Sequence, residues 1–453
     1  MSVKLREYQE EDVQRLMTRS AMGVFNEPRT GKTPTSIVSM QRKDVQRLLV
    51  VCPASIVYKW KEEYKLWVNK EAYVINSATK FNKKDTLIPD TSCVIINYEN
   101  LRDTVKYKGA WEKILKKYKP DGIIVDEAHR CKDRKSANFR AIKKFNKVEA
   151  RLYLTGTPAP NKPWDVWALL HFICPSVFTS YWNFVHEYFE EETLWVGGQA
   201  INQPARFKAG REQLLQNNLN CISVMRKRKD VMPWLPKEET PTVIKLPCTP
   251  SQLRYIRELE ETFETEHVNT QSVLEQLVRI RQICAHPKIL NLRGSSPKID
   301  WLKQYLSDYP EKSIIVFSNS KKFIDLVCNE VRCVYITGET NARMRQTFIN
   351  SFQKGEHKVI VIQTQAGKEG LTLDKADATI FLDTYPPAAD YMQAKDRMVP
   401  TVPENVKPQE IIHLMMKDTY DEHLYKLVKQ GISDTEVIND YIKYIKERRI
   451  PNG

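Results

Sequence analysis

Short apolar runs of strand length recur along this chain of 453 residues, and longer mixed segments separate them. Each run is rich in valine and isoleucine, as are strands that are buried on both faces of a parallel sheet. The runs occupy residues 21–25, 47–53, 93–98, 122–129, 150–158, 312–319, 332–338, 358–364 and 378–383. The segments between them, such as residues 55–67, place apolar side chains at helical spacing. This alternation predicts an α/β fold.

The runs fall into two clusters, at about residues 20–160 and 310–385. The chain between the clusters holds aromatic-rich and charged stretches that are typical of helices. We therefore expect a first α/β domain over residues 1–160, a helical insertion and lobe-crossing segment over 161–300, and a second α/β domain over 301–453. Within the insertion, two consecutive glycines stand between apolar runs in "ETLWVGGQAINQPARF", which indicates a hairpin.

The overall composition favours an acidic partner. Lysine and arginine exceed aspartate and glutamate by 14, and nucleic acid is the commonest acidic partner of a basic protein. The nine cysteines are dispersed, as expected for buried thiols in a reducing compartment. The charged N-terminus differs from a signal peptide, and no apolar run approaches the ~18 residues that span a membrane. We expect a protein of the bacterial or infected host cytoplasm, without a membrane partner.

The stretch "NEPRTGKT" ends like a phosphate-binding loop and lies between an expected strand and an expected helix. Asn26 replaces the first glycine of the usual pattern, and asparagine tolerates positive φ better than other non-glycine residues. A helix N-terminus directs N–H groups at an anion, Lys32 would contact the β and γ phosphates, and Thr33 would bind Mg²⁺. The predicted nucleotide-binding residues of the loop are Asn26, Glu27, Pro28, Arg29, Thr30, Gly31, Lys32 and Thr33. A surface turn is the alternative.

A second motif, "GIIVDEAHR", places two carboxylates at the end of an apolar strand. Asp126 can hold Mg²⁺ through water, and Glu127 can orient an attacking water and accept its proton. An ordinary helix N-cap is the alternative for this motif alone. The two motifs in this order favour ATP hydrolysis with Mg²⁺.

With these motifs in place, the chain resembles the superfamily 2 helicases, and specifically the SNF2-type DNA translocases. The resemblance covers nearly the whole length and implies two RecA-like lobes with helical insertions between them. The stretches similar to motifs of that family are, in order, "LREYQEEDVQRL", "LLVVCPASIVYKWKEE", "CVIINYENL", "LYLTGTPAPNKPWDVWALLHFICP", "VMRKRKDVMPWLPKEE", "RIRQICAHP", "IIVFSN", "TQAGKEGLTLDKADATIFLD" and "YMQAKDRM".

The resemblance implies roles for further residues. Those expected to recognise adenine are Arg6, Tyr8 and Gln9. Those expected to couple the nucleotide to DNA are His129, Thr155, Gly156, Thr157, Gly367 and Gly370. Those expected to contact the DNA backbone, without sequence specificity, are Lys59, Trp60, Asn97, Tyr98, Ser318, Asn319, Thr364 and Gln365.

The catalytic set is completed, by the same resemblance, with Arg397 as an arginine finger and Gln393 beside it. The family typically has a second arginine three residues further on, followed by Gly-Gln, whereas Pro400 stands in this chain. We expect Arg397 to suffice. The alternative is a surface ion pair of Arg397 with Asp396 or Asp390.

The resemblance implies an ATP-driven motor that tracks along duplex DNA. Stand-alone enzymes of this kind, in bacteriophages and prokaryotes, are associated with remodelling forks and with migrating four-way junctions in recombination, repair and replication. We expect that role here. One alternative is a helicase that separates strands while acting on single-stranded DNA. Another is a DNA-binding assembly factor whose ATPase is weak or lost.

Overall fold

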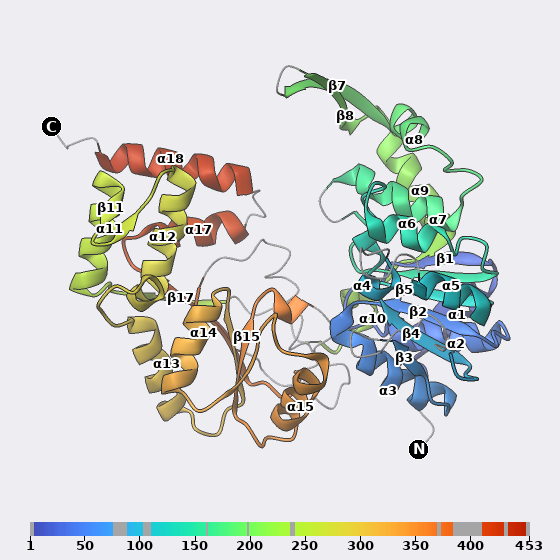
Figure 1. Cartoon of the computed structure of the whole chain (residues 1–453), viewed down its shortest axis with the longest axis horizontal. Helices are drawn as coiled ribbons and strands as arrows, with labels where there is room; N and C mark the ends of the chain where they lie inside the picture. Colours follow the sequence, from blue (N-terminus) through green and yellow to red (C-terminus); the bar gives the residue numbers. More distant parts are fainter. Residues whose placement is uncertain are drawn as a thin grey trace. The chain divides into compact units, whose positions relative to one another are not determined.

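The computed structural model describes residues 4–75, 88–102, 110–159, 162–196, 199–235, 241–368, 373–383, 410–429 and 434–449. The chain forms two compact units, which comprise residues 1–233 and 234–453 (Figure 1). Residues 161–233 of the expected insertion belong to unit 1, and residues 234–300 belong to unit 2.

Unit 1 is built on a parallel sheet of seven strands in the order β3-β4-β2-β5-β6-β1-β9. The strands are β1 (Ala21–Val24), β2 (Leu48–Cys52), β3 (Tyr73–Ile75), β4 (Cys93–Asn97), β5 (Gly122–Asp126), β6 (Ala150–Leu154) and β9 (Ser223–Val224). Every residue of β1, β2, β4 and β5 is buried, because helices cover both faces of the sheet. The apolar runs are therefore parallel strands, as predicted.

The helices of unit 1 form two layers around this sheet (Figure 1). They are α1 (Glu7–Met17), α2 (Lys32–Arg42), η1 (Ala54–Ile56), α3 (Val57–Val68), α4 (Tyr98–Leu101), α5 (Ala110–Tyr118), η2 (Ala128–Cys131), α6 (Ala137–Lys143), η3 (Pro163–Val166), α7 (Trp167–Ile173), α8 (Tyr181–Tyr188), α9 (Arg211–Ile222) and α10 (Arg228–Val231). One hydrophobic core joins the sheet to α1, α2 and α3. The other joins the opposite face to α5, α6, α7, α8 and α9.

The predicted hairpin is present between α8 and α9. Strands β7 (Phe189–Val196) and β8 (Gln199–Phe207) pair in antiparallel register, with Trp195 opposite Ala200. The hairpin extends beyond α8, away from the seven-stranded sheet (Figure 1). Trp195, near its tip, keeps 74% of its surface exposed.

Unit 2 is built on a second parallel sheet, of six strands in the order β10-β17-β16-β13-β15-β14. These strands are β10 (Thr242–Leu246), β13 (Ile314–Ser318), β14 (Val334–Ile336), β15 (Val359–Gln363), β16 (Ala378–Phe381) and β17 (Glu410–Met416). A short antiparallel pair is made by β11 (Glu264–Thr265) and β12 (Val268–Asn269). Four strands of the two sheets, β3, β9, β10 and β17, were not expected from the sequence.

The helices of unit 2 cover this sheet and form a separate cluster. They are α11 (Pro250–Thr262), α12 (Val273–Ala285), η4 (Pro287–Leu290), α13 (Pro297–Asp308), α14 (Lys321–Glu330), α15 (Ala342–Gln353), η5 (Ala366–Lys368), α17 (Tyr420–Lys429) and α18 (Asp434–Arg449). Helices α13 and α14 pack on one face of the sheet, and α15 packs on the other. Helices α11, α12, α17 and α18 share their own core (Figure 1). Within the part of the chain that is described, no helix combines the length and apolar character needed to cross a bilayer.

Candidate nucleotide site and its surroundings

The predicted phosphate-binding loop joins β1 to α2, so it lies between a strand and a helix as expected. Gly31 caps α2 with a φ of 80°, a backbone conformation that side chains with a Cβ rarely adopt. A Cβ on Gly31 would lie 2.1 Å from Nε2 of Gln9, so the position also lacks space. Arg29 is left-handed too, with a φ of 73°.

Asn26 has a different role from the one expected. It is absent from the residues with positive φ, and the tight turn of the loop is made by Arg29 and Gly31 instead. The Asn26 side chain is buried, and its Nδ2 donates to Oδ2 of Asp12 at 2.8 Å. Oδ1 of Asp12 accepts from Nε of Arg226 at 2.8 Å. Asn26 therefore ties the start of the loop to α1 and to the segment after β9.

The Lys32 side chain folds over the loop. Its Nζ donates to the carbonyl oxygen of Asn26 at 2.9 Å and lies 3.4 Å from that of Glu27. The Glu27 carboxylate accepts from the backbone N–H of Arg228 at 2.7 Å. The loop is thus held from both sides, with an ammonium group at its centre where a phosphate would be neutralised.

The three residues expected to recognise adenine gather at this loop. Tyr8 donates its hydroxyl to the carbonyl oxygen of Thr30 at 2.9 Å, and Nε2 of Gln9 donates to the same oxygen at 3.1 Å. The backbone N–H of Arg6 donates to Oε1 of Gln9 at 2.9 Å. Burial raises the pKa of Tyr8, which keeps its hydroxyl a donor. Recognition of adenine by these residues stays a prediction.

The acidic pair lies at the carboxyl end of β5. Asp126 is buried, and its oxygens accept from Nε1 of Trp60 at 2.8 Å and from the backbone N–H of Glu127 at 2.9 Å. Burial, and then the charge of Glu127, raise the pKa of Asp126 to about 6, and the charge of Lys32 opposes this rise. The structure therefore brings Lys32, Asp126 and Glu127 into one electrostatic environment.

This environment fits the Mg²⁺ that the sequence predicts. A buried carboxylate whose pKa is raised is costly to ionise, and a divalent cation would offset that cost. The predicted ligands Thr33 and Asp126 offer hydroxyl and carboxylate oxygens, which Mg²⁺ prefers. Their binding of the metal stays a prediction.

Four of the six residues expected to couple the nucleotide to DNA, namely His129, Thr155, Gly156 and Thr157, belong to unit 1 and follow β5 or β6. Nδ1 of His129 is 3.0 Å from Oγ1 of Thr155 and 3.2 Å from Oε2 of Glu127. Oγ1 of Thr155 also accepts from the backbone N–H of Thr157 at 3.1 Å. A Cβ on Gly156 would lie 3.1 Å from Cδ of Pro28. A continuous set of contacts therefore runs from Glu127 to the loop after β6.

Of the residues expected to contact DNA in unit 1, three have side chains directed inward. Trp60 and Tyr98 are buried, and the Tyr98 hydroxyl donates to the carbonyl oxygen of Asp126 at 2.6 Å. Oδ1 of Asn97 caps α4 by accepting from the backbone N–H of Asn100 at 3.0 Å. Lys59 is half-buried. The positions of Trp60 and Tyr98 support a role in holding Asp126, and their contact with DNA stays a prediction without structural support.

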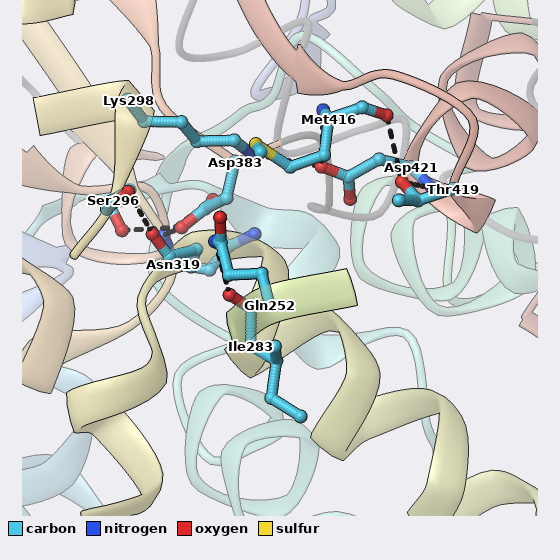
Figure 2. Close-up of polar contacts among 11 residues, drawn as sticks. Gln252, Ile283, Ser296, Lys298, Asn319, Asp383, Met416, Thr419 and Asp421 are labelled. Atoms are coloured by element: carbon cyan, nitrogen blue, oxygen red, sulfur yellow. Dashed lines mark hydrogen bonds and ion pairs between the residues drawn. The ribbon is translucent and has the colours of Figure 1, made fainter. Parts of the chain in front are cut away.

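The predicted DNA residues of unit 2 surround a carboxylate that the sequence did not single out. Asp383 follows β16, and its side chain accepts from the Ser318 hydroxyl and from the backbone N–H of Asn319, the latter at 3.0 Å (Figure 2). The backbone N–H of Thr364 donates to the carbonyl oxygen of Ser318 at 2.9 Å. Thr364 is buried, whereas Gln365 is exposed. Asp383 thus fixes the turn after β13.

Gly367 lies in η5, close behind this turn. A Cβ there would be 2.9 Å from a ring carbon of Phe317, so the close approach requires glycine. The predicted catalytic residues Gln393 and Arg397, and the predicted coupling residue Gly370, lie outside the described residues. Their roles stay predictions.

A buried ion pair lies in the same part of unit 2. Nζ of Lys298, in the first turn of α13, is 3.0 Å from Oδ2 of Asp421, and both side chains are almost fully buried (Figure 2). Oδ2 of Asp421 also accepts from the backbone N–H of Met416 at 3.3 Å. The Lys298 charge also favours ionised Asp383, whose pKa is nevertheless raised by burial. This pair joins the first turn of α13 to the first turn of α17.

The chain is similar to known proteins over most of its length. Residues 8–289 match the family described as SNF2-related domain, and residues 297–399 match the helicase conserved C-terminal domain. The chain is 25% identical over 438 residues to the probable ATP-dependent DNA helicase CHR23 of Arabidopsis thaliana, covering 87% of this chain and 40% of the relative. It is 26% identical over 388 residues to the ISWI chromatin-remodeling complex ATPase ISW2 of Saccharomyces cerevisiae, covering 77% of this chain and 32% of the relative.

The chain therefore spans two fifths or less of the length of these curated relatives. Among solved structures, a Sulfolobus solfataricus SWI2/SNF2 ATPase core in complex with dsDNA aligns at 20% identity with a TM-score of 0.43. That alignment covers 98% of this chain and 94% of the archaeal one.

Proposed function

The chain belongs to the SNF2-related family of DNA-dependent ATPases, and on this premise we propose that it is an ATP-driven motor that tracks along duplex DNA and remodels forked or branched DNA. One observation carries the ATPase part: the buried Asp126 ends β5 directly beside Glu127, and the charges of Glu127 and Lys32 both act on it. The net charge of +14 supports DNA as the partner. Two similar proteins are named as a DNA helicase and as the ATPase of a chromatin-remodelling complex.

In this proposal the chain supplies charge, orientation and a proton acceptor. Lys32 moves from the carbonyl oxygens of Asn26 and Glu27 to the phosphates of ATP. Glu127, held by His129, orients the attacking water and accepts its proton. Bound Mg²⁺ supplies positive charge beside Thr33 and Asp126. Because Thr155 touches His129, a change at the phosphates reaches the loop after β6.

The test is ATP turnover measured without DNA, with single strands, with duplex and with four-way junctions. We expect the strongest stimulation with junctions, and no unwinding of a simple tailed duplex. Lys32→Ala serves as the control and should abolish turnover. Turnover that stays at background with every DNA would overturn the motor proposal and favour the assembly-factor alternative.

A second candidate function, strand separation, is favoured by the β7–β8 hairpin. Its exposed Trp195 could stack on a base at the end of a duplex, as aromatic side chains do on single strands. Unwinding of a tailed duplex that is lost in Trp195→Ala, with ATP turnover retained, would support this candidate. Junction migration without such unwinding would reject it.

For the catalytic set we assign Arg397, with Gln393, to stabilising charge in the transition state. We predict that Arg397→Ala lowers turnover by about 10³-fold or more, as expected for an arginine finger, with little loss of nucleotide affinity. Single-turnover hydrolysis and nucleotide titration would separate these effects. Unchanged turnover would mean that another residue has this role.

A further inference from the structure

Five cationic residues gather on unit 1 at the loop that follows the acidic pair and at the start of the helical insertion. This cluster, called the basic patch below, consists of Lys132, Arg134, Lys135, Arg140 and Lys162. Lys135, Arg140 and Lys162 are exposed, and Lys132 and Arg134 are partly exposed. The acidic residues interspersed with them are Asp133 and Asp165.

Aromatic side chains hold two of these cations, Arg134 and Lys162, in place. The Arg134 guanidinium lies 4.5 Å from the ring centroid of Tyr181 and 5.9 Å from that of Trp182. Nζ of Lys162 lies 5.3 Å from the ring centroid of Trp164. Cation–π contacts restrict the positions of flexible side chains while leaving the charge outside, so the patch is organised before any partner binds.

Contacts connect members of the patch to one another and to their neighbours. Nζ of Lys132 is 3.3 Å from Oδ2 of Asp165, which lies next to Trp164. Arg140 donates from its guanidinium to the carbonyl oxygen of Lys135. The ring of Tyr181 contacts that of Trp167 edge-on at 5.6 Å, which places α8 beside α7. The cations therefore come from the connection between η2 and α6, from α6 and from the residue before η3, and α8 supplies a ring that contacts Arg134.

The short helix η2 links this surface directly to the acidic pair. The backbone N–H of Arg130 donates to the carbonyl oxygen of Glu127 at 3.0 Å, and that of Lys132 donates to the carbonyl oxygen of His129 at 3.1 Å. These bonds make η2 a rigid connection between Glu127 and the patch. A ligand that moves Lys132 would thus displace the residues around Glu127.

We propose that the basic patch binds the sugar-phosphate backbone of a second DNA segment, such as the other arm of a fork. Because the aromatic faces are covered by cations, the surface offers charge to phosphates more than it offers rings to bases. The proposal rests on the proposed function, since a motor on branched DNA must hold more than one arm.

The test compares two variants with equal loss of charge. The patch variant carries Arg134→Gln, Lys135→Gln and Lys162→Gln. The control carries Lys303→Gln, Lys321→Gln and Lys443→Gln, which change exposed lysines of unit 2 that each pair with a glutamate. Binding of forked DNA and of a short linear duplex is measured as a function of salt.

Each phosphate contact contributes about 0.9 to the slope of log K against log salt on duplex DNA. For the patch variant, we therefore expect the slope measured with forked DNA (the fork slope) to become shallower by roughly 2 to 3. The slope measured with the linear duplex should change by less than about 1. The control should leave both slopes within about 1 of the parent.

The proposal is overturned if the patch variant keeps the parent's fork slope, as it would if the patch bound an acidic protein. It is also overturned if fork and linear duplex weaken equally, or if the control matches the patch variant. Urea unfolding checks that the variant folds. If it does not, the double variant Lys135→Gln, Lys162→Gln carries the test, with a fork-slope change of about 1.8. Failure of the motor proposal is a separate result, because it is read from ATP turnover.

Discussion

Two buried carboxylates, Asp126 in unit 1 and Asp421 in unit 2, are held in opposite ways. In unit 1, the hydrogen bonds that Asp126 accepts within the described residues come only from N–H groups. Its carboxylate also lies next to the negative charge of Glu127. In unit 2, Asp421 lies 3.0 Å from the ammonium group of Lys298, which is itself fully buried. A buried charge is costly unless it is paired.

Lys298 neutralises the Asp421 charge within the protein. The pKa of Asp126 is raised instead, which is typical of a carboxylate at a site that a substrate or cation completes. The contrast marks Asp126 as the carboxylate whose charge a bound cation would neutralise.

Glu127→Gln removes the proposed proton acceptor of unit 1 and leaves a side chain of nearly the same size. We expect ATP turnover to fall by about 10²- to 10⁴-fold, the usual contribution of a general base, while ATP affinity changes little. Steady-state turnover and equilibrium nucleotide binding are the measurements. Glu99→Gln, an exposed position that faces Arg130, is the matched control. Turnover within tenfold of the parent would contradict the role of Glu127.

Lys298→Met tests the buried ion pair between Lys298 and Asp421 in unit 2. It leaves Asp421 buried without its cation, and we expect the free energy of unfolding to fall by about 3–5 kcal/mol. Adding Asp421→Asn should restore much of this loss, because the amide keeps an acceptor for the Met416 N–H. Urea unfolding measures both. Equal losses in the single and the double variant would show that Lys298 acts by packing alone.

Asp126 predicts a dependence of stability on pH. Its folded pKa of about 6 lies above the value of an unfolded aspartate, so the folded state holds the proton more tightly. Its contribution to stability is present below about pH 4 and is lost as the pH rises through 6. Between pH 4 and 7 the parent should therefore lose up to about 3 kcal/mol relative to Asp126→Asn, in the absence of Mg²⁺. Equal changes in the free energy of unfolding of the two proteins between pH 4 and 7 would contradict this.

Gly31→Ala is the mildest change. A left-handed backbone costs a residue with a Cβ about 1–2 kcal/mol, and the new methyl group would press on Gln9. We expect a loss of that size in thermal unfolding and weaker nucleotide binding. Adding Gln9→Ala should relieve the contact but not the backbone cost. Full recovery of stability in the double variant would show that the contact with Gln9 alone, and not the backbone conformation, requires glycine at position 31.

The sheets could be predicted because their central strands are continuous valine and isoleucine runs. Strands such as β9, with two residues, and β10, an edge strand with exposed positions, lack that pattern and were missed. The grouping of Lys32, Asp126 and Glu127 also follows from sequence. The carboxyl ends of parallel strands meet at one edge of a sheet, and these residues follow β1 and β5.

The supporting contacts could not be predicted. Asp12 and Arg226 are 214 positions apart, and no local pattern connects them. The same holds for Asp383 and Ser318, and for Lys298 and Asp421. Trp60 and Tyr98 stand at motif positions, yet their inward direction depends on how α3 and β4 pack around Asp126. Partners of this kind are set by tertiary packing.

Strands β6 and β9 both pair with β1, one on each side. The chain therefore leaves the sheet beside the strand that leads into the phosphate loop, and it returns beside that same strand. The segment from η3 through the hairpin to α9 is therefore an insertion whose two ends are both held beside β1. Such a segment can be lengthened, shortened or exchanged for another without disturbing the order of the sheet. The architecture thus offers a place where new attachments can evolve next to the catalytic loop.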